Sequence, residues 1–409
     1  MKERIIFHID VNNAFLSWTA VKLLNEGYEE DIRKIPSVIG GNEKERKGIV
    51  LAKSPVAKKY HIQTAETLYQ ARKKCTRLQV FAPDYDWYVK KSRELFTYLS
   101  KYSPTMQKFS IDECFLDMTG TSYLYKNYLE LAYFIKDDIK EKFGYTVNIG
   151  IGNNKLCAKM ASDFEKPDKV HTLLKDEIVQ KLWPLDVGDL LLVGKKTKEL
   201  LNKLNIYTIE DLAKTDIKIL KKHFKSQAEY LKNAAFGIDN SKVEPRSSQT
   251  KSISISETLS YDCTKESKLE EILFAFTEKA TRDLRYQKQY AKTVAVFYKN
   301  NKFENYSAQE KLPKPTNSTK EIYHLVIEIF RKSYKNDPIR LIGIRLADLT
   351  EKSDYQLSLF DNNDTQDEKN NIQATLDNIN KKYGKSLIAP ASIKMIDKKD
   401  KVKGRGKLY

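Results

Sequence analysis

The segment Ile5-Ile-Phe-His-Ile-Asp10-Val-Asn-Asn-Ala-Phe15 decides which class of fold this sequence predicts. Its short apolar run stops at a carboxylate, which is typical of a buried β-strand that ends at Asp10. A helix is expected over residues 13–24. Strands and helices then continue to alternate as far as residue 164, and this alternation predicts an α/β domain whose helices pack on a central sheet.

The other elements of this first domain follow from the same patterns. They are predicted as a strand at 49–52, a basic helix from about residue 56, a strand pair within 106–117, an amphipathic helix at 122–143, a strand at 145–151 and a helix at 155–164. Gly144 is expected to end the long helix, because glycine readily adopts the left-handed conformation of a C-cap.

The second half of the chain changes character twice. Residues 175–240 are wholly helical in pattern, and residues 241–252 are polar without any period, as expected of a linker. A second α/β unit follows, and a basic tail ends the chain after an acidic, Asn-rich stretch and a helix at 368–383. The second unit is predicted to contain strands at 252–260, 291–298 and 339–349 and helices near 265–285 and 317–333.

Composition limits the classes of protein to which this chain can belong. Its 409 residues suggest roughly two to four domains. The net charge of +17 favours a polyanionic partner such as nucleic acid, although a merely well-solvated surface is the alternative. The four cysteines form no C-x-x-C pair, which argues against zinc and disulfides and predicts a reducing, cytoplasmic location. We expect no signal peptide and no contact with a membrane, since no stretch of 18 apolar residues occurs.

Three carboxylates stand at or near predicted strand ends. Asp10 ends the first strand, and Asp112 and Glu113 lie within the later strand pair. Such carboxylates can converge on a hard cation such as Mg²⁺. Neighbouring residues of a regular strand point to opposite faces, so we expect a turn or bulge at 112–113. A helix cap or an ordinary surface pair is the alternative, and the residue types and their spacing do not decide between these readings.

Three longer motifs occur in order and carry a family resemblance. They are His8-Ile-Asp10-Val-Asn-Asn-Ala-Phe15, Ser110-Ile-Asp112-Glu113-Cys-Phe-Leu-Asp117 and Gly150-Ile-Gly-Asn-Asn-Lys155-Leu-Cys-Ala-Lys159-Met-Ala-Ser-Asp163. Together they resemble the Y-family (DinB/UmuC-like) translesion DNA polymerases, and the resemblance extends to about residue 360. It implies a right-hand architecture of a ferredoxin-like palm, small fingers, a helix-hairpin-helix thumb and an α/β little finger. The boundaries that it implies are palm 1–30 and 80–170, fingers 31–79, thumb 171–240, linker 241–252, little finger 253–352, and a clamp-binding peptide with a tail at 353–409.

The resemblance assigns roles in the reaction by matching position. Asp10 and Asp112 are expected to bridge two Mg²⁺ ions, for which Mn²⁺ can substitute, and Glu113 to complete the primer-side site. The carbonyl oxygen of Val11 is expected to help hold the nucleotide-side ion. The implied activity is template-directed, low-fidelity DNA synthesis past damaged bases by two-metal-ion nucleotidyl transfer.

Three further residues are expected around the deoxynucleoside triphosphate. Phe15 matches the steric gate that excludes a 2′-hydroxyl, with an ordinary core phenylalanine as the alternative. Lys58 and Lys155 match basic residues near the triphosphate. The sequence departs from the commonest family pattern here, because Pro55 replaces a tyrosine and Lys58 an arginine, and this puts the grip on the triphosphate in doubt.

Contacts to primer-template DNA are expected in the thumb and the little finger. The turn Val193-Gly194-Lys195-Lys196-Thr197 looks like a helix-hairpin-helix, in which free N–H groups at a helix start accept a phosphate. An ordinary turn explains this short motif equally well. Ser252, Ser254 and Ser256 are expected on one strand face. Backbone contacts are predicted for Arg246, Lys251, Arg340 and Arg345, with a solvated charged face as the alternative.

The peptide Gln356-Leu357-Ser-Leu359-Phe360 looks like the segment by which bacterial polymerases bind the sliding clamp. Packing of this peptide on the little finger is the alternative. We expect a monomer that is tethered to DNA through the clamp. Two other functions stay open at this point: a clamp-tethered DNA binder without catalysis, and another metal-dependent palm-type enzyme such as a nucleotide cyclase.

Overall fold

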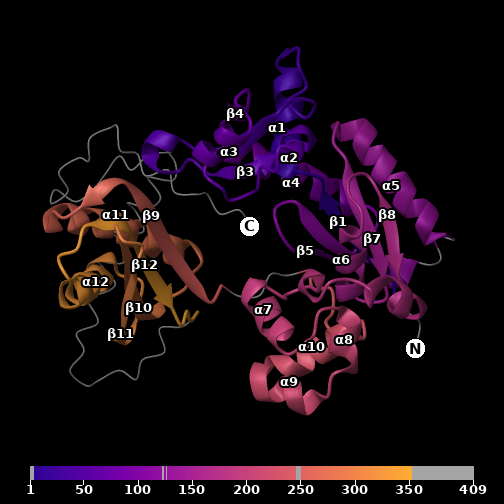
Figure 1. Cartoon of the computed structure of the whole chain (residues 1–409). Helices are drawn as coiled ribbons and strands as arrows, with labels where there is room; N and C mark the ends of the chain where they lie inside the picture. Colours follow the sequence, from indigo (N-terminus) through magenta and orange to yellow (C-terminus); the bar gives the residue numbers. More distant parts are fainter. Residues whose placement is uncertain (1–3, 122–123, 126, 246–249, 352–409) are drawn as a thin grey trace. The chain divides into compact units, whose positions relative to one another are not determined.

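The computed structural model describes residues 4–121, 124–125, 127–245 and 250–351 (Figure 1). The described residues form two compact units. Residues 4–41 and 49–245 make up the first unit, and residues 42–48 and 250–351 make up the second. No helix in these ranges is both long and apolar enough to cross a membrane.

A five-stranded sheet is the centre of the first unit. Its order is β5-β6-β1-β7-β8, with β1 (Ile6–Val11) in the middle. The flanking strands are β5 (Met106–Lys108), β6 (Glu113–Asp117), β7 (Val147–Gly152) and β8 (Val170–Leu173). The first three pairings are antiparallel and β7–β8 is parallel, so β5, β6, β1 and β7 make the predicted ferredoxin-like arrangement. Strand β8 carries the sheet three residues past the predicted palm limit at 170.

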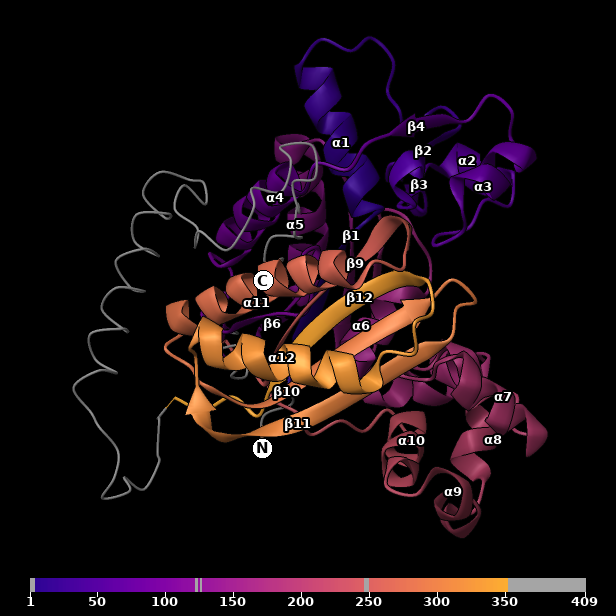
Figure 2. The same cartoon turned by 90° about the vertical axis from the view of Figure 1, so that its left-hand side faces the viewer.

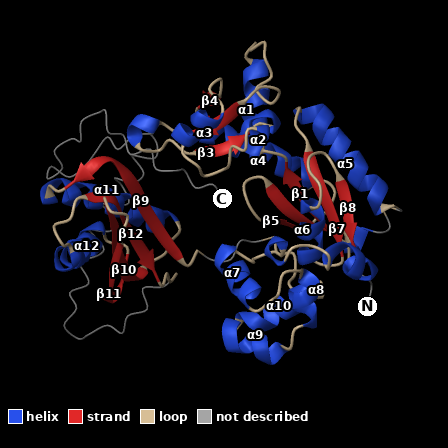
Figure 3. Cartoon of the chain, viewed as in Figure 1, coloured by secondary structure: helices blue, strands red, loops and turns tan. Residues whose placement is uncertain are grey.

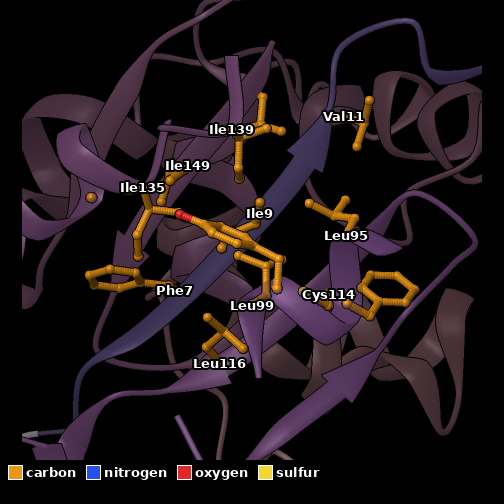
Figure 4. Close-up of a cluster of buried hydrophobic side chains, with 14 of the residues drawn as sticks. Phe7, Ile9, Val11, Leu95, Leu99, Cys114, Leu116, Ile135, Ile139 and Ile149 are labelled. Carbon is orange, nitrogen blue, oxygen red and sulfur yellow. The ribbon is translucent and has the colours of Figure 1, made fainter. Parts of the chain in front are cut away.

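The two faces of β1 have different surroundings, because successive side chains of a strand point to opposite sides. Phe7, Ile9 and Val11 join the main hydrophobic core. Figure 4 shows them beside side chains of helices α4 (Tyr85–Leu99) and α5 (Tyr128–Phe143). Ile6 on the opposite face packs against α6 (Lys155–Asp163). His8 and Asp10 alternate with the core residues and therefore belong to the α6 face.

A smaller sheet and two short helices complete the region predicted as fingers. The sheet order is β3-β2-β4, from β3 (Val50–Lys53), β2 (Ser37–Gly40) and β4 (Gln79–Phe81). The helices are α2 (Pro55–Lys59) and α3 (Leu68–Lys74). Pro55, the departure from the family pattern, occupies the first turn of α2 with Ser54 as N-cap, a position that proline favours. Helix α1 (Ala14–Asn25) shares a small core with these strands.

The region 175–240 is helical, as predicted. It contains α7 (Lys195–Lys203), α8 (Ile209–Lys214), α9 (Ile217–Phe224) and α10 (Gln227–Ala235). Thr208 accepts a hydrogen bond from the Asp211 N–H, and the Asp211 side chain accepts one in return from the Thr208 N–H. This reciprocal capping fixes the start of α8.

The second unit repeats the element order with a different strand order. It runs β9 (Ser252–Cys263), α11 (Glu266–Tyr286), β10 (Ala291–Asn300), β11 (Asn305–Thr316), α12 (Thr319–Ser333) and β12 (Ile339–Ala347). The antiparallel sheet has the order β11-β10-β12-β9. Figure 2 shows α11 and α12 side by side along this sheet, and apolar residues of both helices and of the strands share one core. The predicted α/β class is confirmed in both units (Figure 3).

Several elements differ from the sequence prediction, and strands β2, β4 and β8 and helix α3 are among those that were not predicted. Helix α5 begins at Tyr128 rather than at residue 122, because Asn127 caps it by accepting hydrogen bonds from Leu129 and Glu130. Helix α4 and strand β11 were not predicted. The predicted helix at 368–383 lies outside the described residues.

Candidate active site

The three predicted carboxylates meet where β1 ends. Asp10 and Glu113 are direct cross-strand partners in the β1–β6 ladder. Asp112 stands in the turn before β6, where its carbonyl oxygen accepts a hydrogen bond from the Val11 N–H at 3.1 Å. Backbone pairing, which does not depend on side-chain rotamers, therefore brings the three residues together.

The chain bends at residues 110–112, so the expected turn next to Glu113 is present. The Ser110 hydroxyl donates to the Asp112 carboxylate. Burial raises the pKa of Asp112 above its usual value; the Ser110 hydrogen bond opposes this shift, and the charges of Asp10 and Glu113 add to it. Asp112 is therefore a buried carboxylate close to two others, and a perturbed pKa of this kind is typical of functional sites.

Glu113 is held from two sides. His8 Nε2 lies 3.1 Å from Glu113 Oε2, and Lys159 Nζ lies 2.7 Å from the same oxygen. Burial alone would raise the pKa of Glu113, but the contacts with His8 and Lys159 outweigh it and lower that pKa to about 2. The His8 ring is fully buried, and burial lowers its pKa. Its Nδ1 lies 2.8 Å from Ser162 Oγ, so His8 links α6 to the Glu113 carboxylate.

Helix α6 reaches the carboxylates because it lies directly on β7. A Cβ atom at Gly150 would collide with the backbone of Ala158 and Ser162, and one at Gly152 would lie 2.5 Å from the Ala158 nitrogen. Asn154 caps the helix by accepting a hydrogen bond from the Cys157 N–H at 2.8 Å. The two glycines thus explain why the motif around residues 150–155 is needed at this point of the fold.

The carboxylates contact two lysines to which the sequence analysis gave no role. Lys159 Nζ lies 3.6 Å from Asp10 Oδ2 in addition to its contact with Glu113. Lys166 Nζ donates to Asp10 Oδ2 and lies 2.8 Å from Asp163 Oδ1. Burial would lower the pKa of Lys159, but Asp10 and Glu113 raise it to about 12, so this side chain is charged at neutral pH.

Those lysines affect how a metal ion would be held. Asp10, Asp112 and Glu113 offer carboxylate oxygens, which are the ligands that Mg²⁺ prefers. Over the described ranges, however, no three His, Cys, Asp or Glu side chains are arranged as a group that could hold a metal ion. Asp10 and Glu113 face ammonium groups instead, and Asp112 faces Ser110. The three carboxylates therefore fit a divalent cation chemically. The ammonium groups of Lys159 and Lys166 contact oxygens that such an ion would use.

Lys155 and Lys58, the two lysines predicted to bind the triphosphate, have other surroundings than Lys159 and Lys166. Lys155 Nζ is 3.1 Å from Gln107 Oε1 and lies over the Phe115 ring. Lys58 is exposed on α2. The missed residue Lys159 is part of the third motif and lies one helical turn after Lys155 on α6.

Phe15 belongs to an aromatic stack at the start of α1. Its ring lies parallel to that of Tyr88, with 4.6 Å between the centroids and an interplanar angle of 8°. Tyr85 and Trp18 contact it at larger angles. Phe15 itself is half-buried, so packing fixes the ring while part of it stays accessible. This is compatible with both the predicted gate and the core alternative.

The sheet of the second unit has one face without helices. Ser252, Ser254 and Ser256 are exposed along β9, as the alternation predicted, and Arg345 on β12 is the cross-strand partner of Ser254. The Arg345 guanidinium lies over the Phe297 ring. Over residues 252–258 of β9 and the positions paired with them across the sheet, the open face carries no acidic side chain; the residues there are Ser252, Ser254, Ser256, Thr258, Thr293, Ala295, Phe297, Lys299, Asn305, Ser307, Gln309, Lys311, Leu341, Gly343, Arg345 and Ala347. Asp262, near the end of β9, pairs with Arg46.

Some of the remaining residues that were predicted to contact DNA or the clamp lie among the described residues, and others do not. Lys251 is exposed just before β9, and Arg340 lies over the Phe303 ring. Gly194 is the N-cap of α7, and the exposed Lys195 and Lys196 and half-buried Thr197 form the first turn of that helix. Four clamp-peptide residues and one linker arginine lie outside the described residues: Gln356, Leu357, Leu359, Phe360 and Arg246.

Comparison with known proteins agrees with these observations. The model of the impB/mucB/samB family matches residues 9–163, and that of the family's C-terminal domain matches residues 250–359. DNA polymerase IV of Clostridium acetobutylicum is 47% identical over 386 residues, which are 94% of this chain and 97% of that protein. DNA polymerase IV 1 of Bacillus subtilis is 36% identical over 405 residues, 98% of this chain and 96% of that protein.

The fold is also found among solved structures. A Y-family DNA polymerase chimera of Dbh and Dpo4 superposes with a TM-score of 0.73 at 23% sequence identity, covering 85% of this chain and all of that one. At this identity the likeness concerns the fold alone, and the assignment to a family depends on the closer relatives. On the ground of the family models and these relatives, the chain belongs to the impB/mucB/samB family, the DinB-like Y-family DNA polymerases of bacteria.

Proposed function

We propose that this DNA-directed DNA polymerase extends primers past damaged template bases with low fidelity, and that Asp10, Asp112 and Glu113 hold two Mg²⁺ ions in its active site. One observation carries the proposal: Asp10 and Glu113 are cross-strand partners, and Asp112 occupies the turn between them and β5. The Val11 carbonyl is the fourth proposed oxygen ligand. Mn²⁺, which also prefers oxygen ligands, is the proposed substitute.

When bound, the ions would supply activation of the primer 3′-hydroxyl and neutralisation of the triphosphate charge. The protein's own part is to hold oxygens in place. Asp10 is buried in the sheet, and Glu113 is fixed through His8 by Ser162 on α6. Such supporting contacts keep ligand carboxylates oriented.

Phe15, Lys58 and Lys155 are the proposed nucleotide contacts. The stack with Tyr88 gives Phe15 a fixed orientation, as a gate against a 2′-hydroxyl requires. Exposed Lys58 has a free path to solvent and to an incoming triphosphate. To bind the triphosphate, the Lys155 ammonium group has to give up its hydrogen bond to Gln107.

Contacts with primer-template DNA are proposed for the open face of the second unit and for the start of α7. Hydroxyl groups and cations without carboxylates suit a phosphate backbone, which is bound without regard to sequence. Lys251, Arg340 and Arg345 supply charge in the second unit, and Arg246 is added from the sequence alone. Gly194 leaves the first N–H groups of α7 open to a phosphate, next to Lys195, Lys196 and Thr197.

The peptide Gln356–Phe360 is the proposed attachment to a sliding clamp, on the ground of its sequence alone. We propose a monomer acting in the cytoplasm. All four cysteines are free and buried, as expected of a protein in a reducing compartment.

Primer extension with and without Mg²⁺ tests the proposed reaction. Asp112→Ala and Glu113→Ala should each reduce nucleotide addition at least about 1,000-fold, while the affinity for primer-template DNA stays within about twofold. A template with an abasic site would show whether synthesis passes damage. Asp137→Ala, which removes an exposed carboxylate on α5, is the matched control and should extend normally.

The result also separates the alternative functions. Extension that survives both substitutions would refute the site. A DNA binder without catalysis would extend nothing even as wild type. A nucleotide cyclase would consume triphosphate without any primer. The serines, lysines and Arg345 on the open face of the second unit favour a protein that binds nucleic acid over a cyclase.

A further inference from the structure

Lysine ammonium groups already stand at the carboxylate oxygens to which the proposed metal ions would bind. Lys159 Nζ lies 2.7 Å from Glu113 Oε2 and 3.6 Å from Asp10 Oδ2, so it contacts both cross-strand carboxylates. Lys166 Nζ donates to Asp10 as well. A divalent ion at Asp10 Oδ2 and Glu113 Oε2 would be repelled by the Lys159 ammonium group, because like charges at contact distance oppose each other, and binding at these two oxygens therefore favours movement of that group.

The displaced ammonium group has a second partner within reach. Asp163 Oδ2 lies 3.3 Å from Lys159 Nζ, and Asp163 Oδ1 lies 2.8 Å from Lys166 Nζ. Lys159 and Asp163 are four residues apart on α6, a spacing that allows an ion pair without any movement of the helix. Asp163 is 42% exposed at its side chain and can therefore stay hydrated while it accepts either lysine.

Removing the ammonium group without a replacement would leave the carboxylates in mutual repulsion. Asp10 and Glu113 are cross-strand partners, and the Asp112 carbonyl oxygen accepts from the Val11 N–H, so the three acidic residues lie close together. A lysine between Asp10 and Glu113 offsets that repulsion as long as no metal ion is bound. An internal cation of this kind stabilises the metal-free site, and it also opposes metal binding.

We propose that Lys159 is an internal competitor for the metal ion at Asp10 and Glu113, and that Asp163 receives its ammonium group when the metal binds. The inference rests on the proposed function, because it takes the metal ligands from there. It adds two positioning residues, Lys159 and Asp163, to the site. A consequence is that the protein alone binds divalent ions weakly.

Direct binding of Mn²⁺ tests this proposal without any catalytic readout. Free Mn²⁺ is measured by electron paramagnetic resonance with the full-length protein, in the absence of DNA and nucleotide. Lys159→Met keeps the apolar stem and should tighten Mn²⁺ binding roughly tenfold, the factor expected for one charge-assisted hydrogen bond that no longer competes. Asp163→Asn should weaken binding severalfold, because the ammonium group loses its second partner.

Two variants control for charge and for folding. Lys169→Met removes the same charge from an exposed ion pair with Glu165, and it should leave Mn²⁺ affinity within about twofold of the wild type. Lys159→Arg keeps the competing cation and should keep binding weak. Thermal unfolding of each variant verifies that the sheet is intact.

The outcomes separate this inference from the proposed function. If Asp10→Asn abolishes Mn²⁺ binding but Lys159→Met binds no tighter than the wild type, competition by Lys159 is refuted and the metal site stands. Tightening by Lys169→Met equal to that of Lys159→Met would also refute it, since net charge would then be the cause. If Asp10→Asn has no effect on Mn²⁺ binding in either background, the proposed metal site fails and the inference fails with it.

Discussion

At the scale of the residue, the active site depends on which face of a strand each side chain occupies. Phe7, Ile9 and Val11 go to the core of the first unit, and His8 and Asp10 go to the side of α6. A shift of one residue in the register of β1 would exchange the two sets. The apolar residues of β1 therefore position Asp10 as much as its own contacts do.

Phe15→Ala tests the steric gate at this scale. Removing the ring should raise incorporation of ribonucleotides relative to deoxyribonucleotides roughly 10- to 100-fold, because a purely steric barrier to the 2′-hydroxyl is lost. The measurement is single-nucleotide insertion kinetics with matched ribo- and deoxyribonucleoside triphosphates.

Tyr85→Ala is the matched control, since Tyr85 packs edge-on against Phe15 with 6.1 Å between the centroids. It loosens the same aromatic cluster but leaves the Phe15 ring in place. Equal loss of sugar discrimination in both variants would mean that cluster packing, rather than the Phe15 ring, is responsible.

At the scale of the element, the position of the helices determines which residues each face of a sheet carries. In the second unit, α11 and α12 share a core with the sheet, and the strand face without helices displays serines, lysines and Arg345. In the first unit, α6 lies so close to β7 that Gly150 and Gly152 are required. Where a helix covers the sheet, apolar residues fill the contact; the face that no helix covers carries polar and basic side chains.

Arg345→Ala tests the open face as a surface for DNA. The affinity for primer-template DNA should fall, and the slope of log affinity against log salt concentration should decrease by about one, the value for one phosphate contact. The effect should be the same on templates of unrelated sequence. Fluorescence anisotropy over a series of salt concentrations provides the measurement.

Arg331→Ala serves as the control, because Arg331 lies on α12 and pairs with Glu270 at 2.7 Å. It removes the same charge from the unit without touching the open face. A slope that changes equally in both variants would show that only the overall charge of the unit matters.

At the scale of the whole molecule, the net charge of +17 and the proposed clamp peptide serve the same purpose. Charge attracts the protein to DNA without sequence preference, and a tether raises its local concentration at a primer end. Neither requires a large interface.

Leu359→Ala combined with Phe360→Ala tests the tether. The double variant should extend short linear primers normally and should lose the stimulation given by a loaded sliding clamp, because two apolar anchors are gone. Ser358→Ala is the control within the same peptide. Full stimulation of the double variant would rule out the peptide as the attachment.

Much of this protein is determined locally, and the sequence alone was sufficient for those parts. Apolar runs and periodicity placed β1, α1, α6, α11 and α12 within a few residues, and Gly144 was recognisable as a cap. The three motifs led to the family, which the comparisons confirmed. These features depend on residues that are neighbours in the sequence, so they can be predicted without knowledge of the fold.

Other features were decided only by the tertiary structure. Strand β11 was missed because it is an edge strand with alternating polar residues and two prolines, and its pairing with β10 rather than its composition makes it a strand. The partners of Asp10 and Glu113 were also missed. Lys159 and Lys166 come from a helix and a loop far along the chain, and only the close packing of α6 on the sheet brings their ammonium groups to the carboxylates. Contacts between distant segments are set by how elements pack, and a linear pattern carries no record of that.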